Sequence, residues 1–352
     1  MRLFTSALCT TVAIGLISGC ASNVSPSNSA IPSAGSASRP ISVYDDSAPP
    51  LAVSVLHEII PEAKKKEPSS GIYVSEFGET ELLGYAADNK ANKGPICTVQ
   101  GVSSVNGVAV DLKGNLIDPD GGSGYVIIFQ GPDMCPTKEV GLISDTFGQP
   151  SDASTADGAT DTIAVGNIVD KGSAPGSLSI CTLKAGSCAT NLTNTAIYHA
   201  GGVAMSPSGN CWLDAKTTST GGAALIYFKG CKGGGVVAKG FKQTYYGGID
   251  IDNKGQLVVN DLDSEDTYIY SGCDPTCKVI GGPFMLKGES FFGKLNAANT
   301  DFAAVDRTNG AVDVYSYNGK SIKYEYSFTK GLTVSGSKIV PEGIAQLPRS
   351  KE

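Results

Sequence analysis

A ten-residue stretch at residues 106–115, Asn-Gly-Val-Ala-Val-Asp-Leu-Lys-Gly-Asn, returns in degraded form along the chain. With the fainter copies included, the repeats begin at Asn106, Ser151, Gly201, Gly247, Phe292 and Glu342. They are spaced about 45 to 50 residues apart, and short alternating apolar runs separated by turn residues lie between them. A period of this length is typical of a propeller blade, which is built from four antiparallel strands. The repeat therefore favours a β-propeller.

Five units each carry four strand-like runs, in which Val, Ile, Tyr and Phe occupy alternating positions. After the fifth unit, the chain supplies only one more inner strand, residues 343–347. Runs near the other end, at residues 71–76, 81–86 and 96–102, have the character of the missing three strands. We therefore predict an all-β, six-bladed β-propeller over residues 71–348. Its N- and C-terminal segments share one blade, which removes two exposed sheet edges.

The repeat has the pattern Gly, apolar, Ala or Asp, apolar, three variable residues, Gly, Asn or Gln, and then an apolar run that ends at an acidic residue. This pattern resembles the NHL repeat and the wider six-bladed family that includes the gluconolactonase-like proteins. The resemblance covers residues 71–348. It implies an architecture and says little about activity, because this fold hosts hydrolases, lyases and binding proteins.

In the gluconolactonase-like branch, a divalent metal at the channel mouth is held by a Glu and an Asn or Asp at the starts of inner strands. Here Glu342-Gly343 is similar to the Glu-Gly element of that site and Asn106-Gly107 to its Asn-Gly element, whereas Gly247 replaces the later Asp. Two ligands make an incomplete cage for an ion that needs several oxygens. We therefore predict a non-catalytic binding scaffold with no metal or other cofactor. The alternative is a degenerate metal-dependent lactonase or hydrolase.

The amino terminus predicts export. Residues 1–19 contain Arg2, an apolar run from Leu3 to Ile17 and small residues, a pattern that is too short for a spanning helix and is typical of a signal peptide. The end of the run also resembles the lipobox of bacterial lipoproteins, in which the following Cys, here Cys20, is lipidated. Ala21 replaces the Asp of the inner-membrane retention signal. We expect a lipid anchor in the bacterial cell envelope, favouring the outer membrane, with the domain periplasmic or surface-exposed.

Composition separates the remaining segments. Residues 20–50 are rich in Ser, Ala, Pro and Asn, which predicts a flexible tether. Residues 51–70 begin with an apolar run that can dock on the domain, and residues 349–352 form a tail. The formal charge of −7 argues against a nucleic-acid partner. We expect a monomeric ring that binds a protein, a peptide or a sugar.

The chain has ten cysteines, of which eight follow Cys20. An even number in an exported chain favours structural disulfides. Three pairs flank hairpins or face each other across antiparallel strands, and the last pair remains by exclusion: Cys181–Cys188, Cys273–Cys277, Cys211–Cys231 and Cys97–Cys135. The alternative, a zinc site, is disfavoured by the spacing and by the presence of only two histidines.

Aromatic doublets precede three inner strands: Tyr198-His199, Tyr245-Tyr246 and Phe291-Phe292. We expect them to gather at one end of the central channel. They either pack between blades as core or form a platform that binds a ligand. In the second case Asn106 and Glu342 would supply polar contacts.

Acidic residues recur near the ends of second strands, at Glu76, Asp118, Asp214, Asp261 and Asp306. Such residues usually cap the following turn by accepting backbone N–H groups. We predict this role for all five, with calcium binding as the alternative.

Overall fold

In the computed structural model, all of the described residues belong to one compact unit within residues 45–352. They are 60–61, 70–77, 79–103, 106–136, 138–156, 162–169, 175–182, 185–333 and 340–347. The predicted signal peptide, Cys20, the tether, most of the docking segment and the tail lie outside these ranges.

The regular secondary structure of the described residues is almost entirely β-strand. Three sheets have four strands each, in chain order: β13 (His199–Met205), β14 (Cys211–Thr218), β15 (Gly221–Phe228) and β16 (Val236–Val237); β17 (Ile249–Ile251), β18 (Leu257–Asp261), β19 (Asp266–Ser271) and β20 (Lys278–Met285); β21 (Gly293–Leu295), β22 (Asp301–Asp306), β23 (Ala311–Tyr317) and β24 (Ile322–Phe328). A short 3-10 turn, η2 (Lys229–Cys231), follows β15. No helix in the described ranges is long and apolar enough to cross a membrane.

A fourth sheet has five strands and contains both the first and the last strand of the described residues. Its order is β1 (Ile60–Pro61), β4 (Cys97–Gln100), β3 (Glu81–Ala86), β2 (Gly71–Glu76) and β25 (Pro341–Leu347). Val74 of β2 pairs with Ile344 of β25, so the predicted sharing of one sheet between the N- and C-terminal segments is confirmed. On the outer side, Ile60 pairs with Thr98, and this part of the docking segment covers the edge strand β4.

The remaining strands form one sheet of eight, in the order β5 (Ala109–Val110), β6 (Leu116–Asp120), β7 (Tyr125–Phe129), β8 (Glu139–Ser144), β12 (Ser187–Leu192), β11 (Ser177–Thr182), β10 (Thr162–Asn167) and β9 (Pro150–Thr155). Six separate sheets were expected, and the described residues form five. The difference arises because the outer strands of two expected blades, β8 and β12, meet in a single parallel pair, Ser144 with Ser187.

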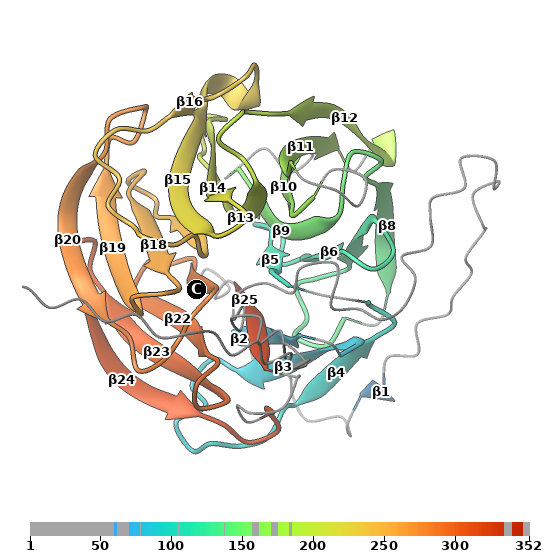
Figure 1. Cartoon of the computed structure of the whole chain (residues 1–352). Helices are drawn as coiled ribbons and strands as arrows, with labels where there is room; N and C mark the ends of the chain where they lie inside the picture. The colour runs from blue at the N-terminus through green and yellow to red at the C-terminus, as the bar shows by residue number, and fades with distance from the viewer. Residues whose placement is uncertain are drawn as a thin grey trace, which may run out of the picture. The chain divides into compact units, whose positions relative to one another are not determined.

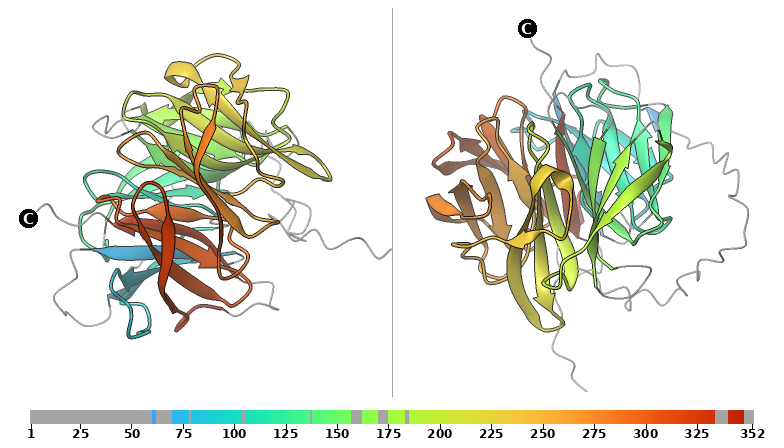
Figure 2. Two further views of the ribbon diagram at one scale, coloured as in Figure 1. Left: turned by 90° about the vertical axis from the view of Figure 1, so that its left-hand side faces the viewer. Right: turned by 90° about the horizontal axis from the view of Figure 1, so that it is seen from above.

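The sheets are arranged in a propeller-like way. Figure 1 shows β5, β9, β13 and β25 near a common centre, and β8, β12, β16, β20 and β24 along the outer edge. The side views in Figure 2 show neighbouring sheets lying face against face. In β14, Trp212 joins the core shared with the β17–β20 sheet, whereas Leu213 joins the core on the opposite side. Successive strand residues point to opposite faces, so each sheet has two buried faces.

The glycine at the start of five of the six repeats lets inner strands meet directly. The N–H of Gly202 donates to the carbonyl of Gly247, which belongs to the next sheet, at 2.9 Å. A Cβ on Gly202 would lie 2.4 Å from the Ile249 nitrogen, and one on Gly343 would lie 1.6 Å from the Asn106 carbonyl oxygen. Side chains cannot fit between strands at this distance, so the repeat needs glycine there.

The polar residues of the repeat cap the turn after the inner strand. One oxygen of Asp111 accepts the N–H groups of Lys113 and Asn115, each at 2.8 Å, and Asp252 does the same for Lys254 and Gln256. This bonding compensates backbone donors that the turn leaves without strand partners. It explains why the Asp-x-Lys-Gly pattern returns with the glycines.

The predicted caps after second strands are only partly correct. Asp261 accepts from the N–H groups of Asp263 and Ser264, and Asp306 accepts from that of Asn309. Glu76 instead accepts from the N–H of Thr333, and Asp214 from that of Gly247 at the start of the next sheet.

The prediction for Asp118 is also wrong. This residue lies within β6, where both carboxylate oxygens are buried without a hydrogen-bond partner among the described residues. Asp120, two residues later, caps the turn by accepting from the N–H of Gly122. The misassignment arose because β6 extends to Asp120, beyond the predicted end of the strand.

Four disulfides are present, and they match the four predicted pairs: Cys97–Cys135, Cys181–Cys188, Cys211–Cys231 and Cys273–Cys277. The first links the sheet of the chain ends to the segment after β7, and the other three close loops of 7, 20 and 4 residues. Their number favours an oxidising compartment.

Candidate functional site

The aromatic doublets divide into buried and half-buried members. Tyr246, Phe291 and Phe292 are fully buried, and the rings of Tyr246 and Phe291 meet edge to face at 5.5 Å. These three side chains are therefore packed in the core, which is the first of the two alternatives for the doublets. Tyr198, His199 and Tyr245 are half-buried.

Tyr198 and His199 lie side by side at the start of β13, with ring centres 4.5 Å apart. Burial, together with the neighbouring Lys216, lowers the pKa of His199 to about 4. The imidazole is therefore neutral near neutral pH and can donate one hydrogen bond and accept one.

Glu342 is fully buried at the start of β25 and forms an ion pair with Arg307, whose Nε lies 3.1 Å from Oε2. Arg307 also contacts Glu289 at 3.1 Å. Burial raises the pKa of Glu342, and Arg307 opposes that rise. The carboxylate that the resemblance assigns to a metal thus already has a guanidinium counterion.

Asn106 is buried, and its Oδ1 has no hydrogen-bond partner in the described part of the chain. In the described ranges, the only three acidic, His or Cys side chains close enough to share an ion are Asp145, Cys181 and Cys188. Both cysteines are in a disulfide and cannot act as thiolate ligands. The residues present do not fit the metal site of the gluconolactonase-like branch.

A cavity of about 1140 Å³ lies at the C-terminal ends of the inner strands, whereas the aromatic doublets lie at or just before the N-terminal ends. Residues from six strands line it, β5, β9, β13, β17, β21 and β25, together with the turns that follow several of them. Its charged residues are Asp111, Lys113, Asp133, Asp250, Asp252 and Lys294. Its larger apolar residues are Val110, Leu112, Met205, Pro207, Ile251 and Leu295.

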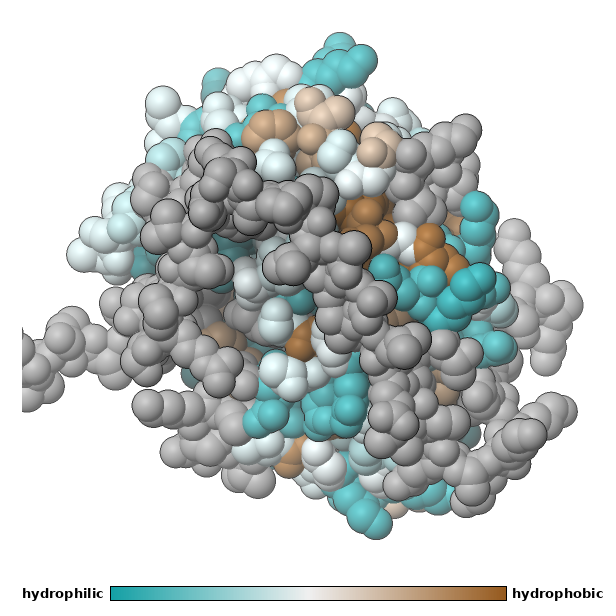
Figure 3. All heavy atoms as spheres, turned by 90° about the vertical axis from the view of Figure 1, so that its right-hand side faces the viewer, coloured by the Kyte–Doolittle hydropathy of each residue, from teal (hydrophilic) through white to brown (hydrophobic). Residues whose placement is uncertain are grey.

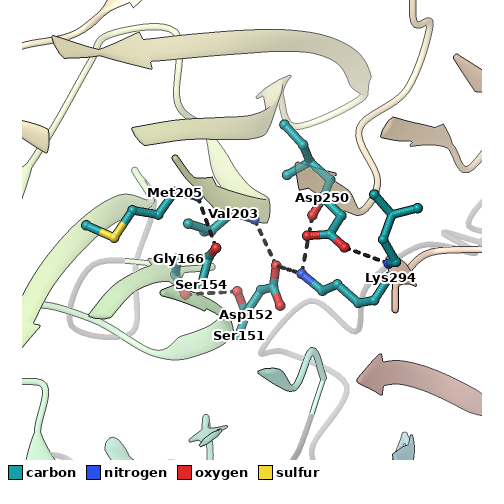
Figure 4. Close-up of polar contacts among 10 residues, drawn as sticks. Ser151, Asp152, Ser154, Gly166, Val203, Met205, Asp250 and Lys294 are labelled. Carbon is teal, nitrogen blue, oxygen red and sulfur yellow. Dashed lines mark hydrogen bonds and ion pairs between the residues drawn. The ribbon is translucent and has the colours of Figure 1, made fainter. Parts of the chain in front are cut away.

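An ion pair lies at the inner end of this cavity. Lys294 Nζ is 3.2 Å from Asp152 Oδ2 and donates to the Ile249 carbonyl at 3.2 Å. Asp152 Oδ2 also accepts the N–H of Val203 at 2.8 Å. Figure 4 shows the Lys294 side chain reaching from its own sheet to Asp152, with Asp250 beside it. Burial raises the pKa of Asp152 to about 6, although Lys294 opposes the shift.

The cavity is suited to binding. Its charges are Asp and Lys, and no aromatic side chain lines it within the described ranges. Lys294 is engaged by Asp152, and Asp111 and Asp252 are engaged as turn caps, so these groups hold the walls in place. Sequence reasoning missed the cavity, although the repeated Asp-x-Lys-Gly turn that forms its rim was visible as a repeat.

Comparison with known proteins identifies no family. No family model matches the chain, and no curated protein matches it. A solved structure described as "Crystal structure of Nidogen/Laminin Complex" is similar over 79% of this chain and 98% of its own, with a TM-score of 0.52 and 13% identity. A functionally unknown protein from Desulfotomaculum acetoxidans DSM 771 is similar over 75% and 81%, with a TM-score of 0.49 and 14% identity.

This likeness shows the fold alone. The first match and the arrangement of the sheets together show a β-propeller-like fold. At such low identity, what the other chain assembles with does not transfer to this one.

Proposed function

We propose that this chain is a lipid-anchored, extracytoplasmic binding scaffold that holds a protein, a peptide or another ligand in the cavity at the turn end of its inner strands and catalyses no reaction. The cavity is the observation that supports this. It is large, partly apolar, and has a few polar groups with fixed partners, which is the usual character of a binding site.

We infer that the eight-stranded sheet counts as two blades. Its halves, β5–β8 and β9–β12, are each antiparallel and are joined by one residue pair. With the other four sheets, this gives six blades and agrees with the six strands that line the cavity. The resemblance to NHL-repeat and gluconolactonase-like propellers supports the same number.

The envelope location is part of the proposal. Residues 1–19 would be removed as a signal peptide and Cys20 lipidated, with residues 20–50 as the tether between the membrane and the ring. The four disulfides support an oxidising compartment. We favour the outer membrane, with the ring periplasmic or surface-exposed.

Other exposed apolar side chains are scattered over the molecule. Val140 and Leu142 lie on β8, and Val236 lies on β16 of a different sheet. Figure 3 shows hydrophobic residues as separate spots among hydrophilic ones on the side that carries β8. Isolated exposed apolar residues are normal on soluble surfaces and do not mark an interface. The cavity is therefore the favoured place for a ligand.

Capture of partners from the native bacterial envelope tests the proposal. The intact lipidated protein should retain a specific partner, and Leu112→Asp should lose it, because Leu112 lines the cavity and is 51% exposed. Val236→Asp is the matched control, since Val236 is 53% exposed on β16. Equal capture by wild type and Leu112→Asp would contradict a ligand site in the cavity.

The alternative implied by the resemblance is a degenerate metal-dependent lactonase or hydrolase. The ion pair between Glu342 and Arg307 argues against it, because a metal cation would have to share one carboxylate with a guanidinium. We therefore propose no metal and no reaction.

A further inference from the structure

Lys216, in β14, is a covered lysine without a counterion. It is 7% exposed but lies at shallow depth, and burial lowers its pKa. Among the described residues, its ammonium has no ion pair and no hydrogen bond. Its Nζ lies over the Tyr245 ring, 5.5 Å from the ring centre. Lysines are almost never covered in this way unless a negative partner is present.

The strand register brings His199 to the same place. His199 in β13 pairs directly with Lys216, and directly opposed residues in antiparallel strands have side chains on the same face. On the other side, Lys216 pairs with Ala223, whose small side chain cannot cover the lysine. The Tyr198 ring lies beside that of His199 at a tilt of 32°, and Tyr245 approaches through its pairing with Gly222.

Among the described residues no carboxylate forms an ion pair with Lys216, although Asp263 lies near enough to Tyr245 to raise the pKa of its phenol. Asp214 lies two residues earlier on the same face of β14, but its Oδ2 accepts the N–H of Gly247. Burial raises the pKa of Asp214 well above its usual range. The positive charge of Lys216 therefore has no protein counterion within the described residues.

We propose that Lys216, His199 and Tyr245 form a binding site for the oxyanion group of a small ligand, a carboxylate or a phosphate. The ammonium supplies charge and up to three donors, the neutral imidazole one N–H and the phenol one O–H. The Tyr198 and Tyr245 rings would flank the rest of the ligand. His199 is at the opposite end of β13 from Met205, which lines the cavity, so this site is distinct from the one in the proposed function.

NMR of the His199 imidazole tests the proposal. The chain has two histidines, so His57→Gln leaves one imidazole signal to follow. Titration with phosphate or acetate at constant ionic strength should give a saturable shift with a Kd of about 1 mM or tighter. The pKa of His199 should rise from about 4, because a bound anion offsets the charge of Lys216. A stronger response to one of the two ions identifies the preferred oxyanion.

Substitutions decide the outcome. Lys216→Met keeps length and apolar bulk, so it should fold with an unchanged or higher Tm and weaken binding by about tenfold or more. Lys239→Met, at an exposed lysine, should bind normally. Leu112→Asp should also bind normally, which separates this site from the cavity. The proposal is overturned if neither ion shifts the His199 signal more than chloride does at the same ionic strength. It is also overturned if Lys216→Met retains the saturable shift.

Discussion

Asp152 and Lys294 form a contact that no local rule predicts. The two residues are 142 positions apart in the chain and come from sheets that are not neighbours, yet their charged atoms lie 3.2 Å apart. Both are buried, and Asp152 is fully so. A buried pair of this kind adds little net stability, because desolvation offsets the attraction. Removing only one partner is costly, because the other charge stays buried alone.

Lys294→Met should therefore lower the free energy of unfolding by about 3 kcal/mol or more at pH 7.5. The double variant Lys294→Met/Asp152→Asn should recover most of this loss, because neither residue then carries a charge. Chemical denaturation of the two variants measures the difference. Equal losses in the single and the double variant would show that the pair matters through packing and not through charge.

Among the elements, the disulfides differ in what they join. Cys97–Cys135 links β4 to the segment that follows β7, and β4 and β7 belong to different sheets. The two cysteines are 38 residues apart in the chain. Cys273–Cys277 closes a turn of 4 residues between β19 and β20. A cross-link restricts the unfolded chain more when it closes a longer loop.

Replacing Cys97 and Cys135 with Ser should cost about 4 kcal/mol, against about 2 kcal/mol for Cys273 and Cys277, by the loop-entropy relation. Thermal unfolding of the two double variants compares them directly. Both should remain folded at room temperature, because each sheet keeps its strand pairing. A larger loss from the short loop would show that strain or packing dominates over chain entropy.

The molecule as a whole buries several carboxyl groups at a cost. Burial raises the pKa of Asp152 and of Asp313 to about 6, and it also raises those of Asp118, Asp214 and Glu342. A carboxyl group whose pKa is higher in the folded state binds protons more tightly there than in the unfolded chain. Its contribution to the free energy of unfolding is therefore greatest below its ordinary pKa. That contribution is lost as the pH rises through the pKa of the folded state.

The protein should consequently be more stable at pH 5 than at pH 7.5, contrary to the common acid-sensitive pattern. His199 opposes this trend by at most about 2 kcal/mol, because its pKa is lowered to about 4 in the folded state and solvent partly screens the half-buried ring. The buried carboxyl groups together outweigh it. Asp152 alone would account for about 1.4 kcal/mol of that difference. Tm measured across this range should rise on acidification, and Asp152→Asn should show a smaller rise. A Tm that falls steadily from pH 7.5 to pH 5 would contradict the prediction.

The strands were predictable because their signal is local. The runs at 71–76 and 81–86 match β2 and β3 residue for residue, since alternating apolar residues and bounding turns mark a strand without reference to its partners. Three of the four disulfide pairs followed from the same strands, and Cys97–Cys135 followed by exclusion. The misplaced cap at Asp118 shows the limit, because β6 runs past the point where the apolar pattern stops.

By itself, the sequence determined the all-β class, the repeat and the return of the last strand to the first sheet, because period and turn chemistry lie within one unit of chain. Only the tertiary structure decided which polar groups meet. The pairing of Asp152 with Lys294, the guanidinium beside Glu342 and the covered Lys216 each depend on how separate sheets or strands are placed. Burial and partner charge set the properties of such groups, and neither is encoded in the residue or its neighbours in the chain.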